Sequence, residues 1–255
     1  MTAGFLKEQE MMEYGLIGAK LGHSFSKDIH SKIGKYDYQL IELTDRQLDE
    51  FLKEKNFKAV NVTIPYKQTV IPYLDHMTQA ASDIGAVNCI RNDSGRLIGH
   101  NTDFDGLSAL IRHARVDLEG KKVLILGTGG TSDTASAVCK SFKAAGAVKV
   151  SRRKTNGAVT YEEAYSRHKD AQIIINTTPC GMYPDIFAKP IDIDGFDSLE
   201  GVIDVIYNPL RSLLITDAKA KNIKAEGGLY MLVAQAVSAL SLIHISEPTR
   251  PRLIS

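Results

Sequence analysis

Residues 121–153 read KKVLILGTGGTSDTASAVCKSFKAAGAVKVSRR. The apolar run 123–126 has the length of a strand and ends at a glycine turn, 127–130, after which Ala, Ser and Lys follow at helical spacing. A second apolar run, 147–150, leads into a basic cluster. Strand, glycine turn, helix and strand form the unit that places a dinucleotide pyrophosphate on a helix N-terminus, because glycine lets the backbone approach the phosphates closely. An ordinary tight strand-to-helix turn is the alternative for this segment taken alone.

The composition is that of a soluble globular chain. Of its 255 residues, 44% are apolar and 24% are charged, and the length allows two medium-sized domains. A net charge of +1 argues against binding to nucleic-acid phosphates, and no apolar run approaches the roughly 18 residues of a membrane span. The cysteines Cys89, Cys139 and Cys180 are scattered and lack metal-ligand spacing. We therefore expect a cytoplasmic protein without a metal site.

Residues 12–110 are expected to form an α/β domain, because strand-like and helix-like segments alternate along them. Expected strands cover 14–18, 38–43, 59–64 and 86–90, and expected helices cover 27–34, 45–54, 79–84 and 104–113. Thr44 is expected to cap the second of these helices. Residues 1–11 form a polar leader that lacks the apolar core of a signal peptide.

Residues 111–228 continue the alternation and are expected to form a Rossmann-like domain. Short apolar strands at 173–175 and 202–206 both end at polar residues, which suggests one shared crevice at the carboxyl ends of the strands. No acid follows the strand at 147–150, where an NAD enzyme usually carries one for the ribose hydroxyl. An Arg-rich turn instead suits the 2′-phosphate of NADP, and a solvated basic turn is the alternative.

Two serines, Ser24 and Ser26, precede the first expected helix. Ser26 alone could be its N-cap, since a hydroxyl oxygen satisfies the first helical amides. A cap does not require Ser24, and two hydroxyls beside a helix N-terminus also suit a small carboxylate. Both interpretations stay open for this pair.

Several short motifs follow one another in order along residues 14–239. They are Ser24-x-Ser26, Asn61-Val62-Thr63-Ile64-Pro65-Tyr66-Lys67, Gly85-Ala86-Val87-Asn88, Asn101-Thr102-Asp103-x-x-Gly106, Asn176-Thr177-Thr178-Pro179-x-Gly181-Met182, Asp204-x-x-Tyr207-Asn208-Pro209 and Gly228-x-x-Met231-Leu232-x-x-Gln235. Together with the glycine turn, they closely resemble the motifs of the shikimate dehydrogenase family. The resemblance implies an N-terminal α/β substrate-binding domain, a Rossmann-like NADP-binding domain, and a helix at 229–239 that returns to the substrate domain.

The reaction implied by the resemblance is the reversible, NADPH-dependent reduction of 3-dehydroshikimate to shikimate, on the route to chorismate and the aromatic amino acids. Lys67 matches the family's catalytic lysine, and Asp103 matches the carboxylate beside it; such chemistry needs a group that exchanges a proton with the substrate oxygen. The substrate residues implied in the same way are Ser24, Ser26 and Tyr207 for the carboxylate and Thr63, Asn88, Asp103 and Gln235 for the ring hydroxyls. NADP is expected to contact Gly127, Thr128, Gly129, Gly130, Thr131, Ser151, Arg152, Arg153, Val205 and Gly228.

The last residues depart from the family, whose members continue for some tens of residues past position 239. Residues 240–255 read LSLIHISEPTRPRLIS, and the segment 240–250 is similar to a translated sequencing adapter. We therefore expect a truncated chain with a foreign tail at 240–255, and a divergent natural tail is the alternative. Loss of a terminal helix would uncover apolar side chains at about 1.5–3 kcal/mol each, so weakened folding is expected.

Three alternatives to a shikimate dehydrogenase remain. A quinate/shikimate dehydrogenase shares the fold. An acidic residue near Arg152 would have favoured its NAD-using forms, and none is present. A non-catalytic ligand sensor would keep the pocket, but the presence of both Lys67 and Asp103 argues against it. The third is an inactive truncated fragment. A small-molecule substrate is the expected partner, and the chain could be a monomer or a homodimer.

Overall fold

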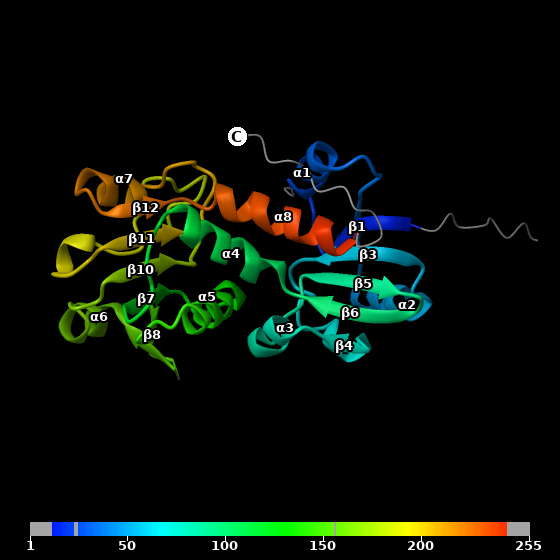
Figure 1. The fold of residues 1–255 in the computed structure, drawn as a ribbon, viewed down its shortest axis with the longest axis horizontal. Coiled ribbons are helices and arrows are strands. Elements are labelled where there is room, and N and C mark those ends of the chain that lie inside the picture. Colours follow the sequence, from blue (N-terminus) through cyan, green and yellow to red (C-terminus); the bar gives the residue numbers. More distant parts are fainter. Residues whose placement is uncertain (1–11, 23–24, 156, 244–255) are drawn as a thin grey trace, which may run out of the picture. The chain divides into compact units, whose positions relative to one another are not determined.

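The computed structural model describes residues 12–22, 25–155 and 157–243 (Figure 1). The predicted leader, Ser24 and positions 244–255 of the predicted foreign tail lie outside these residues. The described residues fall into two compact units, one made of 12–22, 25–78, 86–100 and 239–243 and the other of 79–85, 101–155 and 157–238. Each unit has its own six-stranded sheet, which confirms the predicted α/β class. The predicted domain boundary near residue 110 stays a prediction.

The first unit is built on a mixed sheet with the order β2-β1-β3-β5-β6-β4. Its strands are β1 Met12–Gly18, β2 Gln39–Glu42, β3 Phe57–Val62, β4 His76–Met77, β5 Cys89–Asp93 and β6 Arg96–His100. Strand β1 runs parallel to β2 and β3, whereas β5 is antiparallel to both β3 and β6. The turn between β5 and β6 is closed by the Gly95 amide, which donates to Asn92 Oδ1 at 2.7 Å. Strands β5 and β6 therefore form a hairpin.

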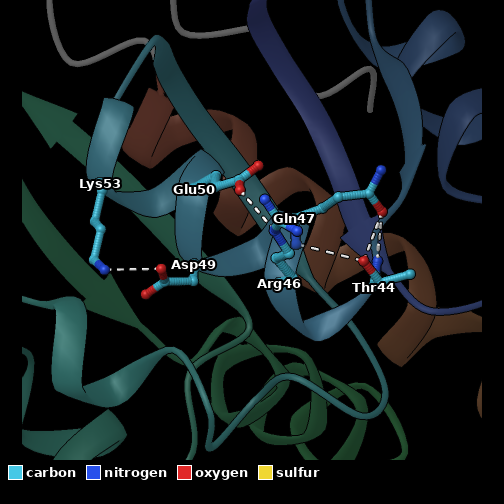
Figure 2. Close-up of polar contacts among 6 residues, drawn as sticks. All are labelled: Thr44, Arg46, Gln47, Asp49, Glu50 and Lys53. Atoms are coloured by element: carbon cyan, nitrogen blue, oxygen red, sulfur yellow. Dashed lines mark hydrogen bonds and ion pairs between the residues drawn. The ribbon is translucent and has the colours of Figure 1, made fainter.

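Two helices belong to the first unit, α1 Ser26–Ile33 and α2 Asp45–Glu54. Helix α2 has the bounds expected from the sequence because its signals are local. Thr44 caps it in a capping box with Gln47, as Figure 2 shows, and Leu48 and Leu52 are its buried residues. On its exposed side lie the ion pairs Arg46–Glu50 at 3.1 Å and Lys53–Asp49 at 2.8 Å (Figure 2).

The second unit is built on a fully parallel sheet with the order β12-β11-β10-β7-β8-β9. Its strands are β7 Lys122–Leu126, β8 Gly146–Ser151, β9 Ala158–Thr160, β10 Ile173–Asn176, β11 Gly201–Asp204 and β12 Lys224–Glu226. Its helices are α3 Gln79–Ile84, α4 Thr102–His113, α5 Gly130–Ser141, α6 Tyr161–Arg167 and α7 Leu213–Ala220. Helix α8, Leu229–Ile243, begins in this unit, and its residues from 239 onward are grouped with the first unit; residues 240–243 belong to the predicted tail. Counted from β7, the strand order is the 3-2-1-4-5-6 of the Rossmann fold. The predicted Rossmann-like fold is confirmed, while the predicted bounds of the domain stay a prediction.

Helices cover both faces of the parallel sheet, and the central strands are therefore apolar on both sides. Val123 and Ile125 of β7 belong to a core cluster with residues of α4 and α5. Leu124 and Leu126 belong to a second cluster with residues of α6 and α7. All four side chains are completely buried. Because this core holds β7 rigidly, the loops that leave the carboxyl ends of the strands start from fixed positions.

Candidate functional site

The glycine turn connects β7 to α5 and has the backbone that a close approach to a ligand requires. Gly127 has a φ of +113°, a conformation that side chains with a Cβ rarely adopt, and a Cβ there would lie 2.8 Å from Thr177 Oγ1. Gly129 is the N-cap of α5 and offers no side-chain cap to the helix amides. No atom lies within 4 Å of where a Cβ would stand on Gly129 or Gly130, so the start of the helix is open.

Strand β10 lies beside β7, and its following loop contacts the glycine turn. The amide of Thr177 donates to the Leu126 carbonyl oxygen at 3.0 Å, and its hydroxyl donates to the same oxygen at 2.6 Å. The strand order reverses between β7 and β10, which is where open α/β sheets bind their ligands. The structure therefore brings the predicted phosphate turn to the switch point of the sheet.

Ser132 occupies the third position of the glycine motif, where a smaller residue is usual. It is completely buried, and its hydroxyl donates to the Gly129 carbonyl oxygen at 2.6 Å. The extra atoms are thus accommodated by a hydrogen bond back to the turn.

A basic corner follows β8. Ser151, Arg152, Arg153 and Thr155 line a surface cavity of about 480 Å³. The amide of Arg153 donates to Ser151 Oγ at 3.4 Å, and both arginines are exposed to solvent. The structure thus brings three predicted cofactor residues, Ser151, Arg152 and Arg153, together around one cavity.

The loop after β11 is joined to the start of α8. The amide of Gly228 donates to the Ile206 carbonyl oxygen at 2.8 Å, and a Cβ on Gly228 would overlap the carbonyl group of Val205. Tyr207, two residues past Val205, is half-buried. Val205 and Gly228, which the sequence places 23 positions apart, therefore lie in direct backbone contact.

Helix α8 packs closely on the first turns of α4. A Cβ on Gly106 would lie 2.8 Å from the Met231 carbonyl oxygen and 2.9 Å from Gln235 Cβ, so only glycine fits. Thr102 Oγ1 donates to Gln235 Oε1 at 3.4 Å. Asp103 is the next residue of α4 and is half-buried. The structure thus places two predicted substrate residues close together, Asp103 in the first turn of α4 and Gln235 in the part of α8 that packs on it.

In the first unit, three predicted residues meet at the carboxyl end of β3. The amide of Thr63 donates to the Ile17 carbonyl oxygen at 3.0 Å. The Val87 amide donates to the Lys67 carbonyl oxygen at 2.7 Å, and the Val62 amide donates to that of Asn88 at 2.9 Å. These bonds tie Thr63, Lys67 and Asn88 to neighbouring backbone. Thr63 and Lys67 are half-buried, whereas Asn88 is buried.

Ser26 is the first residue of α1, and Phe25 is its N-cap, with no side-chain capping bond. The interpretation of Ser26 as the N-cap is therefore wrong, and the binding role of its hydroxyl stays a prediction. Ser24 lies outside the described residues. The predicted catalytic pair is divided between the units, with Lys67 in the first and Asp103 in the second.

Two buried polar residues without a predicted role end neighbouring strands of the second unit. Asn176 ends β10 and Asp204 ends β11; both are completely buried, and Asn176 Nδ2 donates to Asp204 Oδ1 at 3.0 Å. Burial raises the pKa of the Asp204 carboxyl, against the effect of the hydrogen bonds it accepts. The sequence does show that each residue ends a short apolar strand, which could have marked them as candidates. It does not show that they are hydrogen-bonded to each other, because they lie 28 positions apart in the chain.

Within the described ranges, no set of three or more His, Cys, Asp or Glu side chains is arranged to hold a metal ion. Nor does this part of the chain contain a helix with the length and apolar character needed to cross a bilayer.

Comparison with known proteins gives a consistent result. The family model of the shikimate dehydrogenase substrate-binding domain matches residues 16–90. A shikimate dehydrogenase (NADP(+)) of Clostridium perfringens is 36% identical over 253 residues, which cover 90% of this chain and 91% of the relative. Among solved structures, a chorismate mutase/shikimate 5-dehydrogenase fusion protein from Clostridium acetobutylicum has a TM-score of 0.86 at 33% identity, covering 94% of this chain and 92% of that one. Shikimate 5-dehydrogenase from Thermus thermophilus, in complex with NADP(H) and shikimate, has a TM-score of 0.80 at 28% identity, covering 94% and 95%.

Proposed function

The chain belongs to the shikimate dehydrogenase family, and on this premise we propose that it reduces 3-dehydroshikimate to shikimate with NADPH, reversibly, for the synthesis of chorismate and the aromatic amino acids. The observation that carries the proposal is the similarity to an NADP(+)-dependent shikimate dehydrogenase along 90% of the chain. The proposed setting is the cytoplasm, with a small-molecule substrate as partner and the chain acting as a monomer or a homodimer.

The second unit has features that fit NADPH, which supplies the hydride when bound. The open helix start at Gly129 and Gly130 leaves room for a pyrophosphate and presents backbone amides to it. We assign Gly127, Thr128, Gly129, Gly130 and Thr131 to this group. Arg152, Arg153 and Ser151 line a cavity and would hold the 2′-phosphate, since guanidinium groups bind phosphate through two parallel hydrogen bonds. Val205 and Gly228 are assigned to the nicotinamide end.

We assign the proton transfer to Lys67. In the direction of reduction its ammonium gives a proton to the substrate oxygen, and in the reverse direction its amine accepts one. Asp103, in the first turn of α4, is assigned to orient the substrate hydroxyl whose oxygen exchanges this proton with Lys67. Thr63, Asn88 and Gln235 are assigned to the ring hydroxyls, and Ser24, Ser26 and Tyr207 to the carboxylate. Polar groups that remain unpaired with a wrong substrate give such a site its selectivity.

The test is turnover by the purified chain, with shikimate and quinate each offered with NADP and with NAD. We expect turnover of shikimate with NADP, and a Lys67→Ala variant should lose about 100-fold or more of kcat. Lys53→Ala is the matched control, because Lys53 is exposed at the end of α2. Among the described residues, its one ion pair is with Asp49. Comparable rates with quinate would instead assign the broader quinate/shikimate activity.

A folded chain without turnover on either substrate would overturn the proposal and favour a ligand sensor or an inactive fragment. Binding of shikimate without turnover would identify the sensor. A Lys67→Ala variant as active as Lys53→Ala would remove Lys67 from the chemistry.

A further inference from the structure

Asp204 is a buried carboxylate at the carboxyl end of β11, with both oxygens occupied. Its Oδ1 accepts from Asn176 Nδ2 at 3.0 Å and from the Ile206 amide at 3.1 Å, and its Oδ2 accepts from Ser212 Oγ at 2.6 Å. None of the ion pairs among the described residues includes Asp204, and its side chain is completely buried. A carboxylate in such a place is costly unless its hydrogen bonds are complete, so three convergent donors are a specific arrangement.

From Asp204 the network reaches the loop after β10. A carboxylate only accepts hydrogen bonds, so the Asn176 amide must turn its Nδ2 toward Asp204 and its Oδ1 away from it. That Oδ1 accepts from the Thr178 amide at 3.0 Å and from Thr178 Oγ1 at 2.7 Å. The Cys180 amide then donates to Thr178 Oγ1 at 3.3 Å. Asp204 therefore orients the side chain that shapes the loop resting against the glycine turn.

The same carboxylate shapes the loop after β11. Its bond to the Ile206 amide bends the chain directly after the strand, and the Ile206 carbonyl oxygen in turn accepts from the Gly228 amide at 2.8 Å. The Val205 amide donates to the Asn176 carbonyl oxygen at 3.0 Å, which joins the two loops a second time. Ser212, which donates to the other carboxylate oxygen of Asp204, also caps α7, because its Oγ accepts from the Ile215 amide at 3.4 Å.

We propose that Asp204 is the positioning residue that holds the loops after β10 and β11 in the arrangement needed to receive cofactor and substrate. The proposal rests on the proposed function, which assigns Val205 to the cofactor and Tyr207 to the substrate. Asp204 acts through Asn176 and Ile206 and has no assigned contact with either ligand. Its effect is expected on binding more than on the chemical step.

The chemistry of the network selects two informative substitutions. Asp204→Ala leaves three buried donors without their acceptor. Asp204→Asn keeps one oxygen for Asn176 and Ile206, and its amide can donate to Ser212 Oγ, because a hydroxyl rotates to accept. Because Asn also fills the same space as Asp, a third variant, Asp204→Leu, separates the two explanations: Leu is of similar size but accepts no hydrogen bond. It should behave like Asp204→Ala in the measurements below, whereas a simple filler of space would be restored by Leu as well as by Asn.

The experiment compares these variants with the wild-type chain in two ways. Kd for NADPH, KM for 3-dehydroshikimate and kcat are measured on folded protein, and amide hydrogen exchange is measured without ligands over residues 176–182 and 205–209. For Asp204→Ala we expect Kd and KM to rise about tenfold or more, with a smaller change in kcat, because misplaced loops weaken binding. Exchange should accelerate in both segments, and Asp204→Asn should return every value to within about threefold of wild type. A lower Tm with unchanged Kd, KM and loop exchange would overturn the proposal.

A second pair of variants covers the case in which Asp204→Ala does not fold. Ser212→Ala removes one bond to Asp204 together with the cap of α7, whereas Thr160→Ala removes only the cap of α6, where Thr160 Oγ1 accepts from the Glu163 amide at 3.2 Å. Both should lower Tm to a similar extent, but only Ser212→Ala should raise Kd for NADPH and loop exchange, by about threefold. Equal behaviour of the two would overturn the proposal. If the wild-type chain binds NADPH without turnover, the proposed function fails, while the exchange comparison still decides whether Asp204 orders the loops.

Discussion

A Cβ atom on Gly228 would stand 3.0 Å from Val205 Cα and closer still to the Val205 carbonyl group. The neighbour is main chain, so no side-chain rotation can make room. The hydrogen bond from the Gly228 amide to the Ile206 carbonyl oxygen holds the two segments in this approach. The start of α8 and the loop after β11 therefore form one backbone unit that only glycine permits at position 228.

Gly228→Ala should lower the free energy of unfolding by about 3 kcal/mol, because the methyl group has to push the Val205 segment away. NADPH binding should weaken as well, since Val205 is assigned to the cofactor. Urea denaturation and NADPH titration measure the two effects. Gly146→Ala is the matched control: no atom lies within 4 Å of a Cβ there, so the change should stay within about 0.5 kcal/mol. Equal stability of the two variants would mean that the close approach does not exist in solution.

Arg152→Ala should raise Kd for NADPH about tenfold or more and leave Kd for NADH nearly unchanged. The reason is that a guanidinium–phosphate bond is charge-assisted and NADH lacks the 2′-phosphate. Titration with both nucleotides at fixed ionic strength measures the ratio. Arg167→Ala, which removes an exposed guanidinium from the last turn of α6, should change neither value. An equal loss for NADPH and NADH would remove Arg152 from 2′-phosphate recognition.

The sequence predicted those parts of the fold whose signals are local. Helix α2 combines a capping Thr44 with buried Leu48 and Leu52, and both of its ends came out as expected. The apolar strands β7 and β10 stand out because they are buried on both faces. Their order around the glycine turn then predicted the Rossmann arrangement, since few topologies fit such a pattern.

Features that depend on partners distant in sequence were missed. Strand β12 is only three residues, Lys224–Glu226, with one buried side chain, and its pairing with β11 makes it a strand. Strand β5 begins at Cys89, three residues later than expected, because its register is fixed by the hairpin with β6. The same holds for the candidate site. Sequence motifs identified candidate residues, whereas the hydrogen bond between Asn176 and Asp204 became visible only in the folded structure.

Thr44→Ala should lower the free energy of unfolding by about 1 kcal/mol, because Thr44 Oγ1 accepts from the Gln47 amide at the start of α2. Arg46→Ala, which breaks the exposed pair with Glu50, should cost less than about 0.5 kcal/mol. Urea denaturation of both variants measures the difference. A larger loss for Arg46→Ala than for Thr44→Ala would contradict the capping argument.

His30 lies on the buried side of α1, within a cluster of tyrosines. Its Nδ1 is hydrogen-bonded to the Tyr36 hydroxyl, and its ring stacks on Tyr38 with centroids 4.0 Å apart. The Tyr38 hydroxyl donates to Asn61 Oδ1 at 2.8 Å, which connects the cluster to β3. Burial lowers the pKa of His30 to about 4, so the folded chain keeps this imidazole neutral in mildly acidic solution.

Stability should therefore fall as the pH decreases from about 6.5, the pKa of an unfolded histidine, to about 4, since only the unfolded chain binds the proton in this window. The full loss from this one group is about 3 kcal/mol, and above pH 6.5 its contribution is complete. His30→Phe keeps the ring stack but cannot take a proton. It should cost about 1 kcal/mol at pH 8 through the lost bond to Tyr36, and should lose much less stability than wild type on acidification. His113→Phe, which replaces an exposed ring stacked on Tyr230, is the control and should retain the wild-type slope. Urea denaturation from pH 4 to 8 measures all three chains, and identical slopes for wild type and His30→Phe would mean that His30 is not held neutral by the fold.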